Sequence, residues 1–254
     1  GAGGGGPYWC GFFVQAPWRT YVNYNDPRLI EKYYSQMKEW FKYVDKYTVD
    51  GLLKRWPDTK YRDWYLGDWL APMGVDAGNQ ASVDLVSNCF ISECLSTMYK
   101  TAITLGKREE AEEFAIRREK LNKLIHQTFY RADEGIYSTG SQLDMCYPML
   151  VGVVPDSLYN KVKENVVAMT EEKYKGHIAV GLVGVPILTE WAVRNKQVDF
   201  FYQMMKKRDY PGYLLSLIHI SEPTVRQRLG NIGAENEVVC TIVTMELVLG
   251  FIRL

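Results

Sequence analysis

The sequence predicts an all-α fold built from antiparallel helical hairpins. Apolar residues recur at three- and four-residue steps in successive segments, which is the pattern of helices that bury one face. Helix starts and ends are marked by Asp-Pro, by acidic first turns and by glycine. Alternation of apolar and polar residues is too short to make a sheet the main element, except near the carboxyl terminus.

The first expected hairpin joins residues 11–24 to residues 27–44. Asp26 and Pro27 form a strong helix start, with Asp26 as the N-cap and Pro27 at the first helical position. The segment before them, GFFVQAPWRTYVNY, is also expected to be helical, with Pro17 at a kink or a boundary. Apolar side chains then define one face of the second helix: Leu29, Ile30, Tyr33, Met37, Trp40, Phe41 and Val44.

Three further pairs of helices are expected along the chain. The first pair turns at Gly106, and the helix after this glycine has several glutamates in its first turn, which suits the helix dipole. The predicted pairs are residues 82–105 with 107–130, residues 141–152 with 156–173, and residues 185–195 with 198–208.

Successive antiparallel hairpins allow two architectures. One is an α-solenoid, whose repeats share a sequence signature, and no such signature is found. The other is a closed toroid of helical hairpins, with long loops gathered around a pocket at one end. The irregular stretch 46–80 favours the toroid, because a loop of about thirty residues in a compact domain tends to be functional.

The middle of this irregular stretch reads DWYLGDWLAP, residues 63–72. Aromatic residues are the outlier of the composition, with 18 Tyr, 7 Trp and 9 Phe. A tryptophan ring can cover the apolar face of a sugar while a carboxylate binds its hydroxyls. We expect Trp64 to be such a wall, whereas Trp69 is favoured as an anchor of the loop in the core and is also a binding candidate.

The polar candidates have structural alternatives. Asp68 either binds sugar hydroxyls or caps a neighbouring backbone turn. Asp63 and Asp76 are weaker candidates of the same kind. Gln142 and His177 lie near helix ends that face loops and could line the pocket, although structural roles are favoured for both.

Composition and spacing exclude several classes of partner. The formal net charge is zero, from 30 basic and 30 acidic residues, and nucleic acids and anionic membranes both select a basic excess. No apolar run is long enough for a transmembrane helix. The five cysteines and three histidines are not spaced as metal ligands, so we expect buried thiols, no metal and no cofactor.

The ordered motifs resemble the middle of the catalytic domain of bacterial α-L-rhamnosidases, glycoside hydrolase family 78. The early motifs are GGGGPYW, APWRTYVNYNDPRLIEKYYSQMKEWFKYV and WYLGDWLAP, and later segments follow the family's order as far as Leu214. The resemblance implies a partial (α/α)6 toroid over residues 1–214. It also implies that Trp9, which follows the glycine loop, is a wall of the sugar subsite; the alternative is a wedge between loop and helix.

The resemblance further implies hydrolysis of terminal α-L-rhamnose from a glycan or glycoside, with inversion. Inverting hydrolysis needs a general acid and a general base about 6.5–9.5 Å apart. The family's acid precedes the glycine loop, and its base follows the Tyr-Pro and Gly-Tyr motif found at residues 210–214. In the family the acid lies in an Arg-Asp-Glu-Arg or Arg-Glu-Arg motif and the base in Gly-Ala-Thr-Thr-x-Trp-Glu, and the sequence contains neither of these two motifs. No catalytic residue is therefore assigned, and we expect a chain truncated at both ends, inactive and without a stable fold.

Residues 215–254 are expected to be a non-native tail. The string LSLIHISEPT, residues 215–224, matches the translation of a transposase adapter used in sequencing libraries. Two other functions remain open for the chain as a whole. One is a different glycosidase or lyase on the same toroid, and the other is a non-catalytic helical repeat scaffold.

Overall fold

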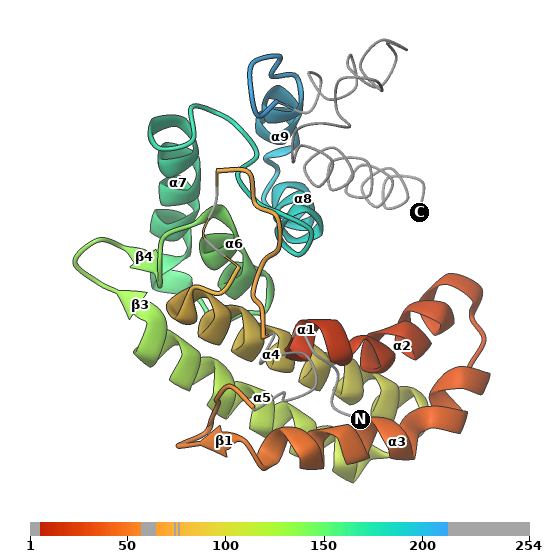
Figure 1. The fold of residues 1–254 in the computed structure, drawn as a ribbon. Helices are drawn as coiled ribbons and strands as arrows, with labels where there is room; N and C mark the ends of the chain where they lie inside the picture. The colour runs from red at the N-terminus through yellow and green to blue at the C-terminus, as the bar shows by residue number, and fades with distance from the viewer. Residues whose placement is uncertain (1–5, 57–64, 74, 76, 213–254) are drawn as a thin grey trace, which may run out of the picture. The chain divides into compact units, whose positions relative to one another are not determined.

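The computed structural model describes residues 6–56, 65–73, 75 and 77–212, and these confirm the all-α fold class (Figure 1). They divide into two compact units. Unit 1 comprises residues 1–67, 80–130 and 151–153, and unit 2 comprises the remaining residues. Apart from helices, the described residues contain two-residue strands in two small antiparallel sheets.

Unit 1 is organised around its longest helix, α4 (Gln80–Thr104), which is buried on nearly all sides. Helix α5 (Arg108–Phe129) returns beside α4 after a short turn at Gly106, whose φ is +73°, so the predicted hairpin is confirmed (Figure 1). The other elements of the unit are α1 (Pro7–Cys10), α2 (Phe12–Tyr24), α3 (Arg28–Asp45), β1 (Thr48–Val49) and β2 (Leu52–Leu53).

Helix α3 begins one residue later than predicted. The Asp26 carboxylate accepts a hydrogen bond from the Arg28 backbone N–H at 3.0 Å, and Pro27 occupies the N-cap. Two members of the predicted apolar face, Leu29 and Tyr33, are exposed, whereas Tyr34 is buried. The reason is geometric: the stripe at 3.6 residues per turn passes from Ile30 through residue 34 rather than residue 33.

Helix α2 confirms the prediction for the segment before Asp26. Pro17 lies inside this helix and is buried, so it does not mark a helix boundary. Within unit 1, α2 packs against α3 and α4. The Tyr8 and Phe90 rings, with centroids 5.0 Å apart, join α1 to α4.

The stretch 46–80 contains regular structure that the sequence analysis missed. Strands β1 and β2 pair antiparallel, with Thr48 opposite Leu53. Asp50 and Gly51 connect them with φ values of +51° and +81°, as a two-residue hairpin turn requires. The Asn88 amide of α4 then accepts from the Leu53 N–H at 2.9 Å and donates to its carbonyl at 3.1 Å.

Unit 2 is built around α6 (Gln142–Leu150), whose first eight residues are all buried. This helix packs against α7 (Asp156–Glu172) and α8 (Gly184–Arg194), and α8 packs against α9 (Val198–Met205), as the predicted pairs required (Figure 1). β4 (Ile136–Tyr137) pairs with β3 (Tyr130–Arg131) before α6. No helix among the described residues is long and apolar enough to span a membrane.

Candidate functional site

The Asp68 carboxylate is the centre of a buried polar network in unit 2. Its side chain is 7% exposed. One oxygen, Oδ2, accepts the Gly181 N–H at 2.7 Å. The other, Oδ1, accepts the N–H groups of Trp69, Val183 and Gly184 at 2.9, 3.0 and 3.1 Å. Because Gly184 is the first residue of α8, Asp68 caps this helix from more than a hundred residues away in the sequence.

Two glycines allow this close approach. A Cβ on Gly181 would lie 1.8 Å from the Trp69 carbonyl oxygen, which is backbone and cannot rotate away. A Cβ on Gly184 would lie 2.8 Å from Asp68 Oδ2. The Leu182 N–H donates to the Trp69 carbonyl at 2.9 Å, so the two backbone segments are also joined directly. Both positions therefore require glycine.

The chemistry of Asp68 is that of a structural acceptor. Burial raises the pKa of its carboxyl, and the four backbone N–H donors oppose this rise. Three of the four donors bond to Oδ1 and one bonds to Oδ2, so both oxygens of the carboxylate accept from backbone. The geometry thus corresponds to the capping alternative, and a contact between Asp68 and a sugar hydroxyl stays a prediction.

The backbone of Trp69 is held by hydrogen bonds, and the residue as a whole is half-buried. Its N–H donates to Asp68 and its carbonyl accepts from Leu182. Leu70, which follows, adopts a φ of +59° and is exposed. The backbone of Trp69 is therefore held in place while part of its indole surface remains open, and its role as a sugar wall stays a prediction.

Gln142 also bonds to the segment between α7 and α8 that Asp68 contacts. It is fully buried, at the start of α6. Its Nε2 donates to Thr170 Oγ1 at 3.0 Å and to the His177 carbonyl at 3.1 Å, and its Oε1 accepts the Ala179 N–H at 2.8 Å. Gln142 and Asp68 together therefore hold residues 176–184, named here the 176–184 connection, between α7 and α8.

His177 belongs to this connection and is 2% exposed. Its Nε2 lies 3.1 Å from Oδ2 of the exposed Asp209. Its Nδ1 has no hydrogen-bond partner among the described residues. The pKa of Asp209 is lowered first by its own backbone N–H and then by His177 and Lys207. A pocket-lining role for His177 or Gln142 stays a prediction.

Trp9 lies in unit 1, on the short helix α1, and is half-buried. Its ring packs edge-on against Tyr8 at 6.4 Å between centroids. Gly11 ends α1 and has no room for a side chain, because a Cβ there would lie 2.5 Å from Phe90 and 2.8 Å from Trp40. The turn is thus fixed against the core of unit 1, and part of the Trp9 surface remains open.

Three predicted site residues, Asp63, Trp64 and Asp76, lie outside the described residues, as does the proposed tail, 215–254. Among the described residues, no group of three or more His, Cys, Asp or Glu side chains could hold a metal ion. Cys89, Cys94 and Cys146 are buried, and Cys10 is half-buried.

Sequence reasoning missed several residues of this network. Thr170 is fully buried and accepts from Gln142, and Gly181 and Gly184 admit Asp68 and Trp69. The signal available was the cluster of glycines in VGLVG, residues 180–184, directly before a helix. Asp68, which bonds to this glycine segment, could not be found from the local pattern, because it lies more than a hundred residues earlier in the sequence.

The antiparallel helix pairs described above, such as α4 with α5 and α8 with α9, are characteristic of helical-hairpin domains. Residues 1–221 match the model of the bacterial α-L-rhamnosidase six-hairpin glycosidase domain. The chain therefore belongs to this family. The matched residues extend a short way into the proposed tail, whose origin stays a prediction.

Relatives and solved structures agree with the family. An α-L-rhamnosidase of Alteromonas sp. (strain LOR) is 24% identical over 208 residues, which are 79% of this chain and 22% of the relative. One from Streptomyces avermitilis is 25% identical over 211 residues, 83% of this chain and 19% of the relative. The chain thus spans about a fifth of the length of these relatives.

The fold is similar to that of two solved α-L-rhamnosidases. The structure from Dictyoglumus thermophilum has a TM-score of 0.73 at 20% identity, and covers 82% of this chain and 23% of that one. The structure from Aspergillus terreus has a TM-score of 0.73 at 22% identity, and covers 86% and 25%. These likenesses confirm the expected all-α, six-hairpin type of fold.

Proposed function

We propose that this chain is part of a glycoside hydrolase that removes terminal α-L-rhamnose from a glycan or glycoside by an inverting acid/base mechanism. The single observation that supports this most is the match of residues 1–221 to the six-hairpin family. One similar solved structure, from Streptomyces avermitilis, is described as complexed with L-rhamnose, with a TM-score of 0.67. Inversion is the prediction made from the resemblance.

The described residues would contribute sugar-binding surface. Trp9 and Trp69 each have a half-buried ring on a backbone fixed by close contacts, which is the arrangement of a stacking wall. A preorganised ring binds a sugar face at little entropic cost, because the site is formed before the ligand arrives. Trp64, Asp63 and Asp76 remain in the proposal as sequence-based candidates.

The proposal includes that this chain does not catalyse hydrolysis by itself. Inversion needs an acid and a base about 6.5–9.5 Å apart. The buried carboxylate nearest in sequence to the candidate tryptophans, Asp68, is occupied as an acceptor by four backbone N–H groups. It is therefore assigned a structural role in this proposal, and both catalytic carboxyls are proposed to lie outside residues 1–214.

The test is to incubate the chain with p-nitrophenyl α-L-rhamnoside and follow two signals. Absorbance measures release of p-nitrophenol, and saturation-transfer NMR measures contact between the sugar protons and the protein. We expect no release above the uncatalysed rate, together with saturation transfer to the rhamnoside. Release of p-nitrophenol would contradict the inactivity, and equal transfer to p-nitrophenyl α-D-glucoside would contradict the choice of sugar.

Two variants locate the binding surface. Trp9→Ala and Trp69→Ala each remove a proposed wall, and each is expected to weaken saturation transfer to the rhamnoside severalfold. Trp191→Phe is the matched control, because Trp191 is fully buried in unit 2 and its loss leaves the surface unchanged. If neither surface variant differs from this control, the assignment of Trp9 and Trp69 is wrong.

A further inference from the structure

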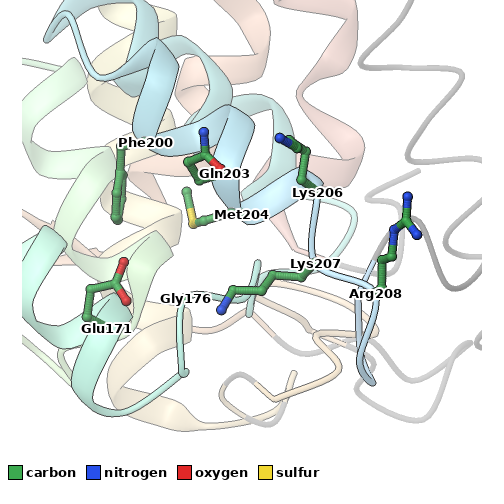
Figure 2. A pocket seen from close by; sticks show the side chains of 8 residues that line it. All are labelled: Glu171, Gly176, Phe200, Gln203, Met204, Lys206, Lys207 and Arg208. Carbon is green, nitrogen blue, oxygen red and sulfur yellow. The ribbon is translucent and has the colours of Figure 1, made fainter.

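Unit 2 contains a cavity of about 440 Å³ that is not lined by Asp68 or by the backbone groups bonded to it. It opens between the end of α7 and the end of α9 (Figure 2). Glu171 of α7 and Gly176 form one side, and Phe200, Gln203 and Met204 of α9 form the other. None of these residues was assigned a function by the sequence analysis or belongs to the proposed sugar wall.

The cavity has an excess of positive charge. Lys206, Lys207 and Arg208 follow α9 consecutively and all line the cavity, against the single carboxylate of Glu171. The chain as a whole is electrically balanced, so this is a local excess. Within the part of the chain that the structure describes, no salt bridge or side-chain hydrogen bond occupies any of these four charged groups.

The ammonium of Lys207 and the carboxylate of Glu171 face each other across Gly176. A Cβ built on Gly176 would lie 3.2 Å from Lys207 Nζ and 3.3 Å from Glu171 Oε2. Both atoms are close to one point, yet they are farther apart than the 4.0 Å of a direct ion pair. Figure 2 shows Lys207 extended towards Glu171 across this gap.

Such a gap suits a ligand that both accepts and donates hydrogen bonds. A hydroxyl placed between the two groups would accept from Lys207 and donate to Glu171. Gly176 keeps the gap open, because it has no side chain and adopts a φ of +72°. The opposite side adds the half-buried Phe200, which offers an apolar surface to the face of a ring, with the buried Met204 beside it.

The floor of the cavity is connected to the core of unit 2. Met204 is 2% exposed, and its sulfur lies 3.8 Å from Gln142 Nε2, the amide that holds the 176–184 connection. Gly176 is the first residue of that connection, and its N–H donates to the Thr170 carbonyl at 2.9 Å. The two sides of the cavity are therefore positioned by buried residues, so its shape does not depend on the exposed lysines.

From this arrangement we propose that the cavity binds a uronic acid residue of a glycan. A uronic acid combines a carboxylate for the cations, hydroxyls for Glu171 and Lys207, and a ring face for Phe200. A sulfate ion satisfies only the first of these contacts, because it has no hydroxyl to donate to Glu171 and no ring face for Phe200. The inference goes beyond rhamnoside hydrolysis and depends only on the residues of this cavity.

The experiment measures binding of methyl β-D-glucuronide to the whole chain by isothermal titration calorimetry at low salt. Methyl β-D-glucoside and inorganic sulfate are the two comparison ligands. We expect saturable binding of the glucuronide, at least tenfold weaker binding of both others, and loss of affinity as salt screens the cations. Binding of the glucoside as tight as that of the glucuronide would overturn the proposal, and so would equal binding of sulfate.

Matched variants assign the contacts. Lys207→Met is expected to weaken glucuronide binding at least tenfold, which is the effect of losing one charge-assisted hydrogen bond. Lys161→Met is the control, since it removes an exposed lysine of α7 that does not line the cavity. Glu171→Gln should lower the preference for glucuronide over sulfate. Circular dichroism checks the fold of each variant, and equal affinities of the two lysine variants would refute the assignment.

These outcomes are independent of those for the proposed function. Glucuronide binding is measured without a rhamnoside and without hydrolysis. A chain that binds glucuronide but shows no contact with p-nitrophenyl α-L-rhamnoside would support this inference and contradict the proposed sugar. A chain that contacts p-nitrophenyl α-L-rhamnoside but does not bind glucuronide would contradict this inference and support the proposed sugar.

Discussion

The two units stabilise their irregular segments by different means. In unit 1, aromatic rings pack directly: Trp56, in the irregular stretch 46–80, lies 5.5 Å from Tyr43 and 5.1 Å from Tyr65, between ring centroids. In unit 2, the 176–184 connection is held by two polar side chains, Asp68 and Gln142, that bond to its backbone. Unit 1 also uses a buried amide, Asn88, to hold β2.

This difference predicts how each unit responds to substitution. Apolar packing tolerates exchange of side chains of similar volume. A carboxylate that serves four backbone donors tolerates no exchange, because each buried N–H that loses its acceptor costs about 1–3 kcal/mol. Unit 2 should therefore be the more sensitive of the two at single positions.

The largest effect is expected for Gly181→Ala. The new Cβ would meet the Trp69 carbonyl oxygen at 1.8 Å, and both atoms are fixed to backbone. The 176–184 connection must then separate from the segment after Asp68, at a cost of at least about 5 kcal/mol in the free energy of unfolding. Urea denaturation followed by circular dichroism measures this cost.

Gly106→Ala is the matched control in unit 1. Gly106 has a φ of +73°, but a Cβ there meets nothing within 4 Å. The expected cost is that of a left-handed residue alone, about 1–2 kcal/mol. If the two alanines cost the same, steric contact between the two segments of unit 2 is not the dominant effect and the comparison fails.

An intermediate effect is expected for Asp68→Ala, which leaves four backbone donors without their acceptor. The expected loss of stability is about 4 kcal/mol or more, from at least about 1 kcal/mol for each of the four donors. Amide hydrogen exchange at Gly181, Val183 and Gly184 should accelerate by about a thousandfold. The Lys107 amide of unit 1, which donates to the Ala102 carbonyl at 2.8 Å, reports on the other unit.

The Lys107 amide is expected to keep its exchange rate in Asp68→Ala. Equal acceleration of amide exchange in both units would mean that they unfold together. The loss of Asp68 would then not destabilise unit 2 alone. Asp68→Asn keeps the shape of the side chain and one oxygen acceptor, so its effect should lie between those of the wild type and alanine.

The smallest effect concerns Asp26, the exposed counterpart of Asp68 at a helix start. The Arg28 side chain and then its backbone N–H lower the pKa of Asp26 to about 2. An unperturbed aspartate has a pKa of about 3.9. Because the folded pKa is the lower one, Asp26 stabilises the fold above about pH 4, and this contribution disappears as the pH falls towards about 2.

NMR titration of the Asp26 carboxyl measures this shift. Arg28→Ala should raise the pKa of Asp26 towards the unperturbed value, and Asp26→Asn should remove its share of the pH dependence of thermal unfolding. An unchanged pKa in Arg28→Ala would show that the arginine contact is not formed in solution.

The helices could be predicted from the sequence because their information is local. The spacing of Ile30, Met37, Trp40 and Phe41, the turn at Gly106 and the start at Asp156 each depend on residues within a few positions of one another. The hairpin at Asp50-Gly51 had an equally local signal, a DG pair between short apolar segments, and it was missed within a stretch interpreted as loop.

The polar network could not be predicted, because its partners are distant in sequence. Nothing near Asp68 indicates that its acceptors are filled by Gly181, Val183 and Gly184. The same aspartate is compatible with a sugar contact or with a cap until the fold brings those donors to it. The sequence therefore pointed to Asp68 but left its role open between a sugar contact and a backbone cap.

The pairing of Asp68 with residue 181 also has a consequence for synthesis. The two residues are 113 positions apart, and ribosomes add about 5–20 residues per second. Asp68 is therefore synthesised roughly 5 to 20 seconds before Gly181, its partner in unit 2. During this interval the Asp68 carboxylate keeps its water shell, so folding of unit 2 exchanges that water for backbone N–H groups.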